Sequence, residues 1–112
     1  WGGALEVCEL AAEESGVSTT VVDLGSLAPL DEVAILEHAA QTGKLVIAHP
    51  GWRGPGLGSE LAALFADRAI LHLDAPVLRV TGSPGPISAG HEDAALPTVA
   101  AVVDAIRTVA NY

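Results

Sequence analysis

The chain has 112 residues, of which 50% are hydrophobic and 17% charged, a composition that predicts one folded domain with its own core. Fourteen acidic residues against five basic ones give a formal net charge of −9, which disfavours a nucleic-acid partner and favours basic protein partners. The lone Cys8 excludes a disulfide framework and a cysteine-based zinc site. No apolar run approaches the roughly 20 residues of a membrane-spanning helix, so we expect no membrane partner.

Helical and strand-like patterns alternate along the first half of the chain. Apolar residues at helical spacing predict a first helix that ends near Gly16, and the β-branched run Thr19–Val22 predicts a strand. Asp31 can cap a second helix that ends at Gly43. The uninterrupted apolar run over residues 45–48 then predicts a strand that is buried on both faces.

The second half continues the alternation. A glycine-rich loop over residues 51–58 leads into a third helix with Phe65 facing inward, residues 77–80 predict a third strand, and Pro97 lies near the start of a last helix. This order predicts an α/β fold with a mainly parallel sheet covered by helices on both faces. Because a strand normally precedes the first helix of such a repeat, we expect a first strand that is missing from this fragment.

The glycine-rich loop is a weak candidate for an anion or nucleotide site. Backbone amides at a helix start can hold a phosphate, and the candidate residues are Arg53, Gly56, Gly58 and Ser59. The spacing is G-x-G-x-G rather than the dinucleotide fingerprint G-x-G-x-x-G, and Pro55 removes one amide. The simpler interpretation is a loop that packs tightly against the end of the sheet. A small anion- or nucleotide-binding regulatory module therefore stays an alternative function.

The polar residues of the predicted strands do not assemble a catalytic site. No two histidines have metal-ligand spacing, so we predict no metal site. His49 ends a strand, where parallel sheets place ligands, but without a visible partner it is better interpreted as satisfied by backbone. Arg79, inside an apolar strand, needs solvent or an acid such as Asp23 or Asp74. We predict no catalytic residue in this chain.

Four segments in a fixed order carry a resemblance to a known family. They are D-L-G-S-L-A-P-L-D at residues 23–31, T-G-K-L-V-I at 42–47, G-L-G-S-E at 56–60 and D-A-P-V-L-R-V-T-G at 74–82. Together they resemble the transketolase C-terminal domain of the β subunits of thiamine-diphosphate-dependent 2-oxoacid dehydrogenases of the pyruvate, branched-chain or acetoin type. The resemblance covers the chain from about Gly3 to Tyr112.

This resemblance implies a three-layer α/β/α sandwich, with residues 1–112 forming a single domain of a larger enzyme subunit. It implies no cofactor in this domain, with thiamine diphosphate and Mg held by other domains of the parent enzyme. The implied roles in a complex for oxidative decarboxylation are dimerisation, contact with the α subunit, and docking of the small subunit-binding domain of a lipoyl acyltransferase. The expected compartment is the bacterial cytoplasm.

The resemblance also indicates where such docking would occur. The family places acids beside the D-A-P turn and at the C-terminal end, which here implies Asp74 and the carboxylate of Tyr112 if that residue is the true end. Trp52 is a further candidate for partner contact. The chain departs from the family at Pro50, where the family has Glu after a histidine, and at Pro55, where it has Gly. A fragment of transketolase or deoxyxylulose-phosphate synthase is a second alternative.

Overall fold

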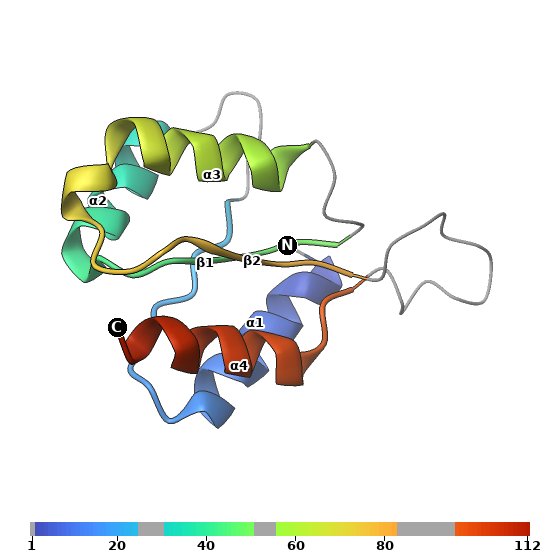
Figure 1. Ribbon diagram of the computed structural model, residues 1–112. Helices are drawn as coiled ribbons and strands as arrows, with labels where there is room; N and C mark the ends of the chain where they lie inside the picture. The colour runs from blue at the N-terminus through green and yellow to red at the C-terminus, as the bar shows by residue number, and fades with distance from the viewer. Residues whose placement is uncertain (1, 25–30, 51–55, 83–95) are drawn as a thin grey trace.

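The computed structural model describes residues 2–24, 31–50, 56–82 and 96–112, which form helices around a small sheet (Figure 1). In chain order the elements are α1 (Gly2–Ser15), α2 (Glu32–Thr42), β1 (Val46–Ala48), α3 (Leu57–Arg68), the 3₁₀-helix η1 (Ile70–His72), β2 (Leu78–Val80) and α4 (Val99–Ala110). The two strands pair in parallel, with Val46 opposite Leu78 and Ala48 opposite Val80. This arrangement confirms the predicted α/β class.

Helices cover both faces of the sheet. Figure 1 shows α2 and α3 on one face and α1 and α4 on the other. The core toward α2 and α3 is formed by buried Ile35, Ala39, Ile47, Leu61, Phe65 and Ala69. The core toward α1 and α4 is formed by buried Ala11, Val102, Val103 and Ile106. Because side chains alternate along a strand, Ile47 packs into the first core and its neighbours Val46 and Ala48 against the second. The layers are those of an α/β/α sandwich.

Several helix ends follow from single residues, and the sequence predicts those at Gly16, Asp31 and Gly43. The Asp31 carboxylate accepts a hydrogen bond from the Ala34 amide at 3.1 Å and caps α2. Gly43 ends the same helix in the left-handed conformation, with φ of 69°. Gly16 follows α1 with φ of 72°. At α4, the Thr98 hydroxyl caps the helix by accepting from the Ala101 amide at 3.1 Å.

The prediction of a strand over Thr19–Val22 is wrong. This segment has no regular secondary structure, and in the described part of the chain β1 pairs with β2 alone. A β-branched run forms a strand only when a neighbouring strand supplies hydrogen bonds, whatever its own propensity. Burial of residues 45–48 on both faces is also only partly met, because Ile47 is buried while Val46 and Ala48 are half-buried.

Candidate docking surface

Asp74 is held at the end of the sheet where the strands begin. Its amide donates a hydrogen bond of 2.7 Å to the carbonyl of Gly43, the residue that ends α2. The carboxylate lies so close to Gly43 that a Cβ at that position would collide with it. Asp74 itself is exposed. The left-handed glycine therefore both ends a helix and leaves room for an exposed carboxylate.

Tyr112 lies at the same end of the sheet. The Lys44 ammonium donates hydrogen bonds of 3.1 Å to the backbone carbonyls of Ala110 and Tyr112. A lysine is well placed there because the C-terminus of a helix carries a partial negative charge. Gly43 and Lys44 are neighbours in the chain, and they hydrogen-bond to Asp74 and Tyr112 respectively. Asp74 and Tyr112 therefore lie at the same end of the sheet. The structure thus brings together two predicted partner-binding residues that lie far apart in the sequence.

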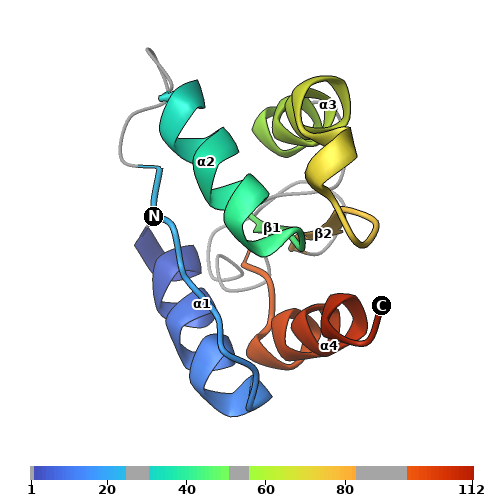
Figure 2. The ribbon, with the colours of Figure 1, turned by 90° about the vertical axis from the view of Figure 1, so that its left-hand side faces the viewer.

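Exposed apolar residues lie at this same end of the molecule (Figure 2). Leu71 is 94% exposed, Tyr112 66% and Ile70 58%. Figure 2 looks at this end of the molecule and shows the segment after α3 close to the C-terminal end of α4. We call Ile70, Leu71, Asp74 and Tyr112 the amino-edge patch. Sequence reasoning missed Ile70 and Leu71, although two adjacent apolar residues directly after an amphipathic helix are a readable signal.

His49 and Arg79 lie toward the opposite end of the sheet, where the strands finish. His49 Nδ1 donates to the Pro50 carbonyl at 2.8 Å, which confirms that the backbone satisfies this nitrogen. Its Nε2 is buried and has no hydrogen-bond partner among the described residues. Arg79 Nη1 donates to the Ser59 hydroxyl at 2.8 Å, a partner that the sequence analysis did not consider. The cation of β2 is therefore tied to the first turn of α3.

The glycine-rich loop is only partly described, and its end has a packing role. A Cβ at Gly58 would collide with the His49 imidazole, so this glycine lets α3 approach the end of β1. Gly56 caps α3 without a side-chain hydrogen bond. The remaining anion-site candidate Arg53 lies outside the described residues, as does the partner-site candidate Trp52. The described geometry supports the tight-packing interpretation, and an anion site stays a prediction.

Across the described ranges, no three His, Cys, Asp or Glu side chains converge as metal ligands. Burial raises the pKa of the Cys8 thiol, which keeps it protonated and weakly nucleophilic at neutral pH. None of the described helices has the length and apolar character needed to cross a membrane.

Comparison with known proteins identifies the family. The family described as transketolase, C-terminal domain, matches residues 1–102. The chain belongs to this family. The predicted resemblance is thereby confirmed, and the sandwich of helices around parallel strands is compatible with the transketolase C-terminal fold.

Similar relatives of this transketolase C-terminal domain are β subunits of 2-oxoacid dehydrogenases. The mitochondrial 2-oxoisovalerate dehydrogenase subunit beta 2 of Arabidopsis thaliana is 37% identical over 115 residues, which cover 100% of this chain and 32% of the relative. The pyruvate dehydrogenase E1 component subunit beta of Rhizobium meliloti (strain 1021) is 36% identical over 99 residues, which cover 87% of this chain and 22% of the relative. The pyruvate dehydrogenase E1 component subunit beta of Leifsonia xyli subsp. xyli (strain CTCB07) is 46% identical over 90 residues, which cover 77% of this chain and 26% of the relative. The chain spans about a third or less of these relatives.

Proposed function

We propose that residues 1–112 are the non-catalytic C-terminal domain of a 2-oxoacid dehydrogenase β subunit. Its role is assembly: dimerisation, contact with the α subunit, and docking of the subunit-binding domain of the lipoyl acyltransferase in a complex for oxidative decarboxylation. The relatives, which are pyruvate and 2-oxoisovalerate dehydrogenase β subunits, support this assignment over a transketolase or synthase fragment. We place the parent in the bacterial cytoplasm, following the bacterial relatives.

The amino-edge patch is the observation that carries the docking proposal. Leu71 is almost fully exposed, and it shares one end of the molecule with an exposed aromatic residue and an exposed carboxylate, a combination that suits an interface with an apolar centre and a charged rim. The net charge of −9 favours a basic partner.

The chemistry of decarboxylation is assigned to the rest of the parent enzyme. Thiamine diphosphate and Mg would be bound there, as the resemblance to 2-oxoacid dehydrogenase β subunits implies. The domain would contribute by positioning subunits. We therefore expect substitutions at the patch to change assembly and leave the decarboxylation step of the free dehydrogenase unchanged.

Calorimetry with the complete β subunit, in its dehydrogenase, and the isolated subunit-binding domain of a lipoyl acyltransferase tests the proposal. Asp74→Asn should weaken binding about tenfold, which corresponds to about 1.4 kcal/mol, and the effect should shrink as salt is raised. Leu71→Ser should weaken binding without lowering the free energy of unfolding, since this side chain is 94% exposed.

Asp104→Asn supplies the matched control, because it removes the same charge from an exposed position in the middle of α4. This variant should bind within about twofold of the wild type. Equal losses for Asp74→Asn and Asp104→Asn would show that only net charge matters. Absence of binding by the complete wild-type subunit would refute the docking role.

A further inference from the structure

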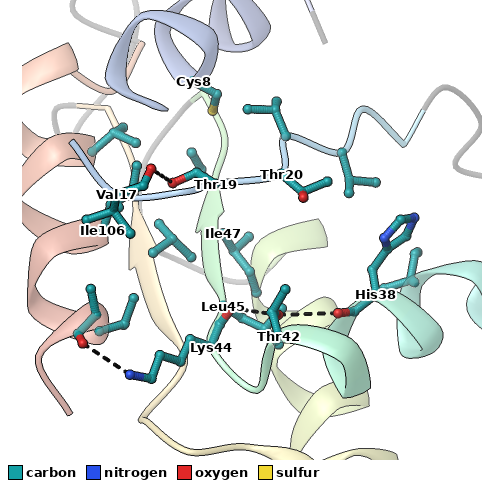
Figure 3. Close-up of a pocket in the computed structure, with 18 of the residues that line it drawn as sticks. Cys8, Val17, Thr19, Thr20, His38, Thr42, Lys44, Leu45, Ile47 and Ile106 are labelled. Carbon is teal, nitrogen blue, oxygen red and sulfur yellow. Dashed lines mark hydrogen bonds between the residues drawn. The ribbon is translucent and has the colours of Figure 1, made fainter. Parts of the chain in front are cut away.

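Lys44 connects two parts of the molecule that are distant in the sequence. Its ammonium donates hydrogen bonds of 3.1 Å to the carbonyls of Ala110 and Tyr112, which lie 66 and 68 residues further along the chain. Figure 3 shows the Lys44 side chain reaching from the segment before β1 toward α4. The final carbonyls of a helix have no partner within the helix, so an ammonium supplied from elsewhere stabilises that end. The end of α4 is therefore fastened to the start of β1.

The backbone that carries this lysine is itself held in place. The Thr42 hydroxyl donates to the Lys44 carbonyl at 3.2 Å, and the carbonyl of Gly43 accepts from the Asp74 amide at 2.7 Å. Lys44 is half-buried, so packing also restricts its side chain. One short segment thus holds Asp74 through its backbone and Tyr112 through the lysine side chain.

Tyr112 depends on this contact more than Asp74 does. Its side chain is 66% exposed, so packing restrains it little. Its amide donates to the Val109 carbonyl at 3.3 Å, a bond within the last turn of its own segment. Among the described residues, the hydrogen bond from Lys44 is the one that ties Tyr112 to a distant part of the chain.

We propose that Lys44 is a positioning residue of the amino-edge patch, which holds Tyr112 at the end of the sheet where Asp74 lies so that one partner meets both. This proposal rests on the proposed docking function. A basic partner is repelled by an ammonium, so charge alone predicts that neutralising Lys44 strengthens docking. Positioning predicts the opposite, because a Tyr112 that is no longer held must be ordered when the partner binds.

The sign of the change in affinity is the first test, measured by calorimetry with the complete β subunit in its dehydrogenase and the isolated subunit-binding domain. Lys44→Gln should weaken binding about fivefold, because the shorter glutamine cannot reach both carbonyls. Lys44→Arg, which keeps the charge and several donors, should bind within about twofold of the wild type. The matched control is Arg68→Gln, which removes the same charge from an exposed ion pair with Glu32 and should not weaken binding.

A double-mutant cycle separates positioning from a general loss of structure. In a chain that already carries Tyr112→Ala, Lys44→Gln should cost less than about twofold in affinity, because the ring that Lys44 positions is gone. A general loss of structure would weaken binding equally in both backgrounds. In the free dehydrogenase, hydrogen exchange of peptides covering residues 103–112 should be at least about tenfold faster with Lys44→Gln than with Lys44→Arg.

Lys44→Gln that binds as tightly as the wild type or more tightly would overturn the positioning role. An equal cost of Lys44→Gln with and without Tyr112→Ala would overturn it too. If the wild-type enzyme does not bind the subunit-binding domain, the docking function fails, and the exchange rates still decide whether Lys44 holds Tyr112. If Lys44→Gln prevents assembly, Lys44→Met, which keeps the length and packing of the stem, takes its place in each measurement.

Discussion

Two glycines end helices in the same backbone conformation but in different surroundings. Gly16 has φ of 72° and Gly43 has φ of 69°, values that an L side chain adopts only at a cost. Nothing lies within 4 Å of a Cβ built at Gly16, whereas a Cβ at Gly43 would collide with the Asp74 carboxylate. The two positions therefore separate the cost of backbone conformation from the cost of displacing the Asp74 carboxylate.

Gly16→Ala should lower the free energy of unfolding by about 1 kcal/mol, the cost of the left-handed conformation alone. Gly43→Ala should lower it by about 2–3 kcal/mol, since the Asp74 carboxylate must also move. Urea denaturation of both variants measures the difference. Adding Asp74→Ala to Gly43→Ala should recover part of the loss, and equal costs for the two glycine variants would contradict the close approach of the carboxylate.

At the scale of elements, α4 is hydrogen-bonded to α1, the other helix on its face of the sheet. Arg107 donates hydrogen bonds of 3.1 Å to the carbonyls of Ser15 and Glu14, which lie at the end of α1. These carbonyls have no partner within their own helix, and a cation there also opposes the partial negative charge of the helix end. Arg68 makes a different kind of contact, an ion pair of 2.7 Å with Glu32 in which both side chains are about half exposed.

Arg107→Gln should lower the free energy of unfolding by about 1–2 kcal/mol, because two charge-assisted hydrogen bonds to helix-end carbonyls are lost. Exchange of amides in the last turn of α1 should also accelerate. Arg68→Gln removes the same charge from an exposed ion pair and should cost less than about 1 kcal/mol. Thermal unfolding and hydrogen exchange of both variants provide the measurement. A larger loss for Arg68→Gln would show that Arg107 does not hold α1.

The elements also show what sequence patterns can and cannot determine. Helices were predictable because signals such as the Asp31 cap and the apolar stripe of α4 act within one segment. The strand predicted at Thr19–Val22 failed because a strand depends on a neighbour that no local pattern contains. The packing reason for Gly58 required the position of the His49 ring. Asp74 was predicted by family resemblance, whereas its location at the same end of the sheet as Tyr112 came only from the fold.

At the scale of the whole molecule, the net charge of −9 acts on both folding and binding. Four exposed carboxylates follow one another along α1: Glu6, Glu9, Glu13 and Glu14. Repulsion among like charges destabilises the folded state, whereas attraction to a basic partner stabilises the complex. Salt screens both effects. Added salt should therefore raise the stability of the free domain and lower its affinity for a basic partner.

Raising NaCl from about 20 to about 300 mM should increase the Tm of the free domain by about 3 °C, because screening reduces self-repulsion by an amount on the order of 0.5–1 kcal/mol. Over the same range, binding of the basic acyltransferase domain should weaken. The double variant Glu9→Gln/Glu13→Gln removes a like-charge pair spaced four residues apart on a helix and should raise the Tm at low salt while reducing its salt dependence. Calorimetric scans and binding titrations on the same samples give both responses. A Tm that falls with added salt would mean that attractive pairs such as Arg68–Glu32 outweigh the repulsion. That result would contradict the prediction that the net charge destabilises the folded domain.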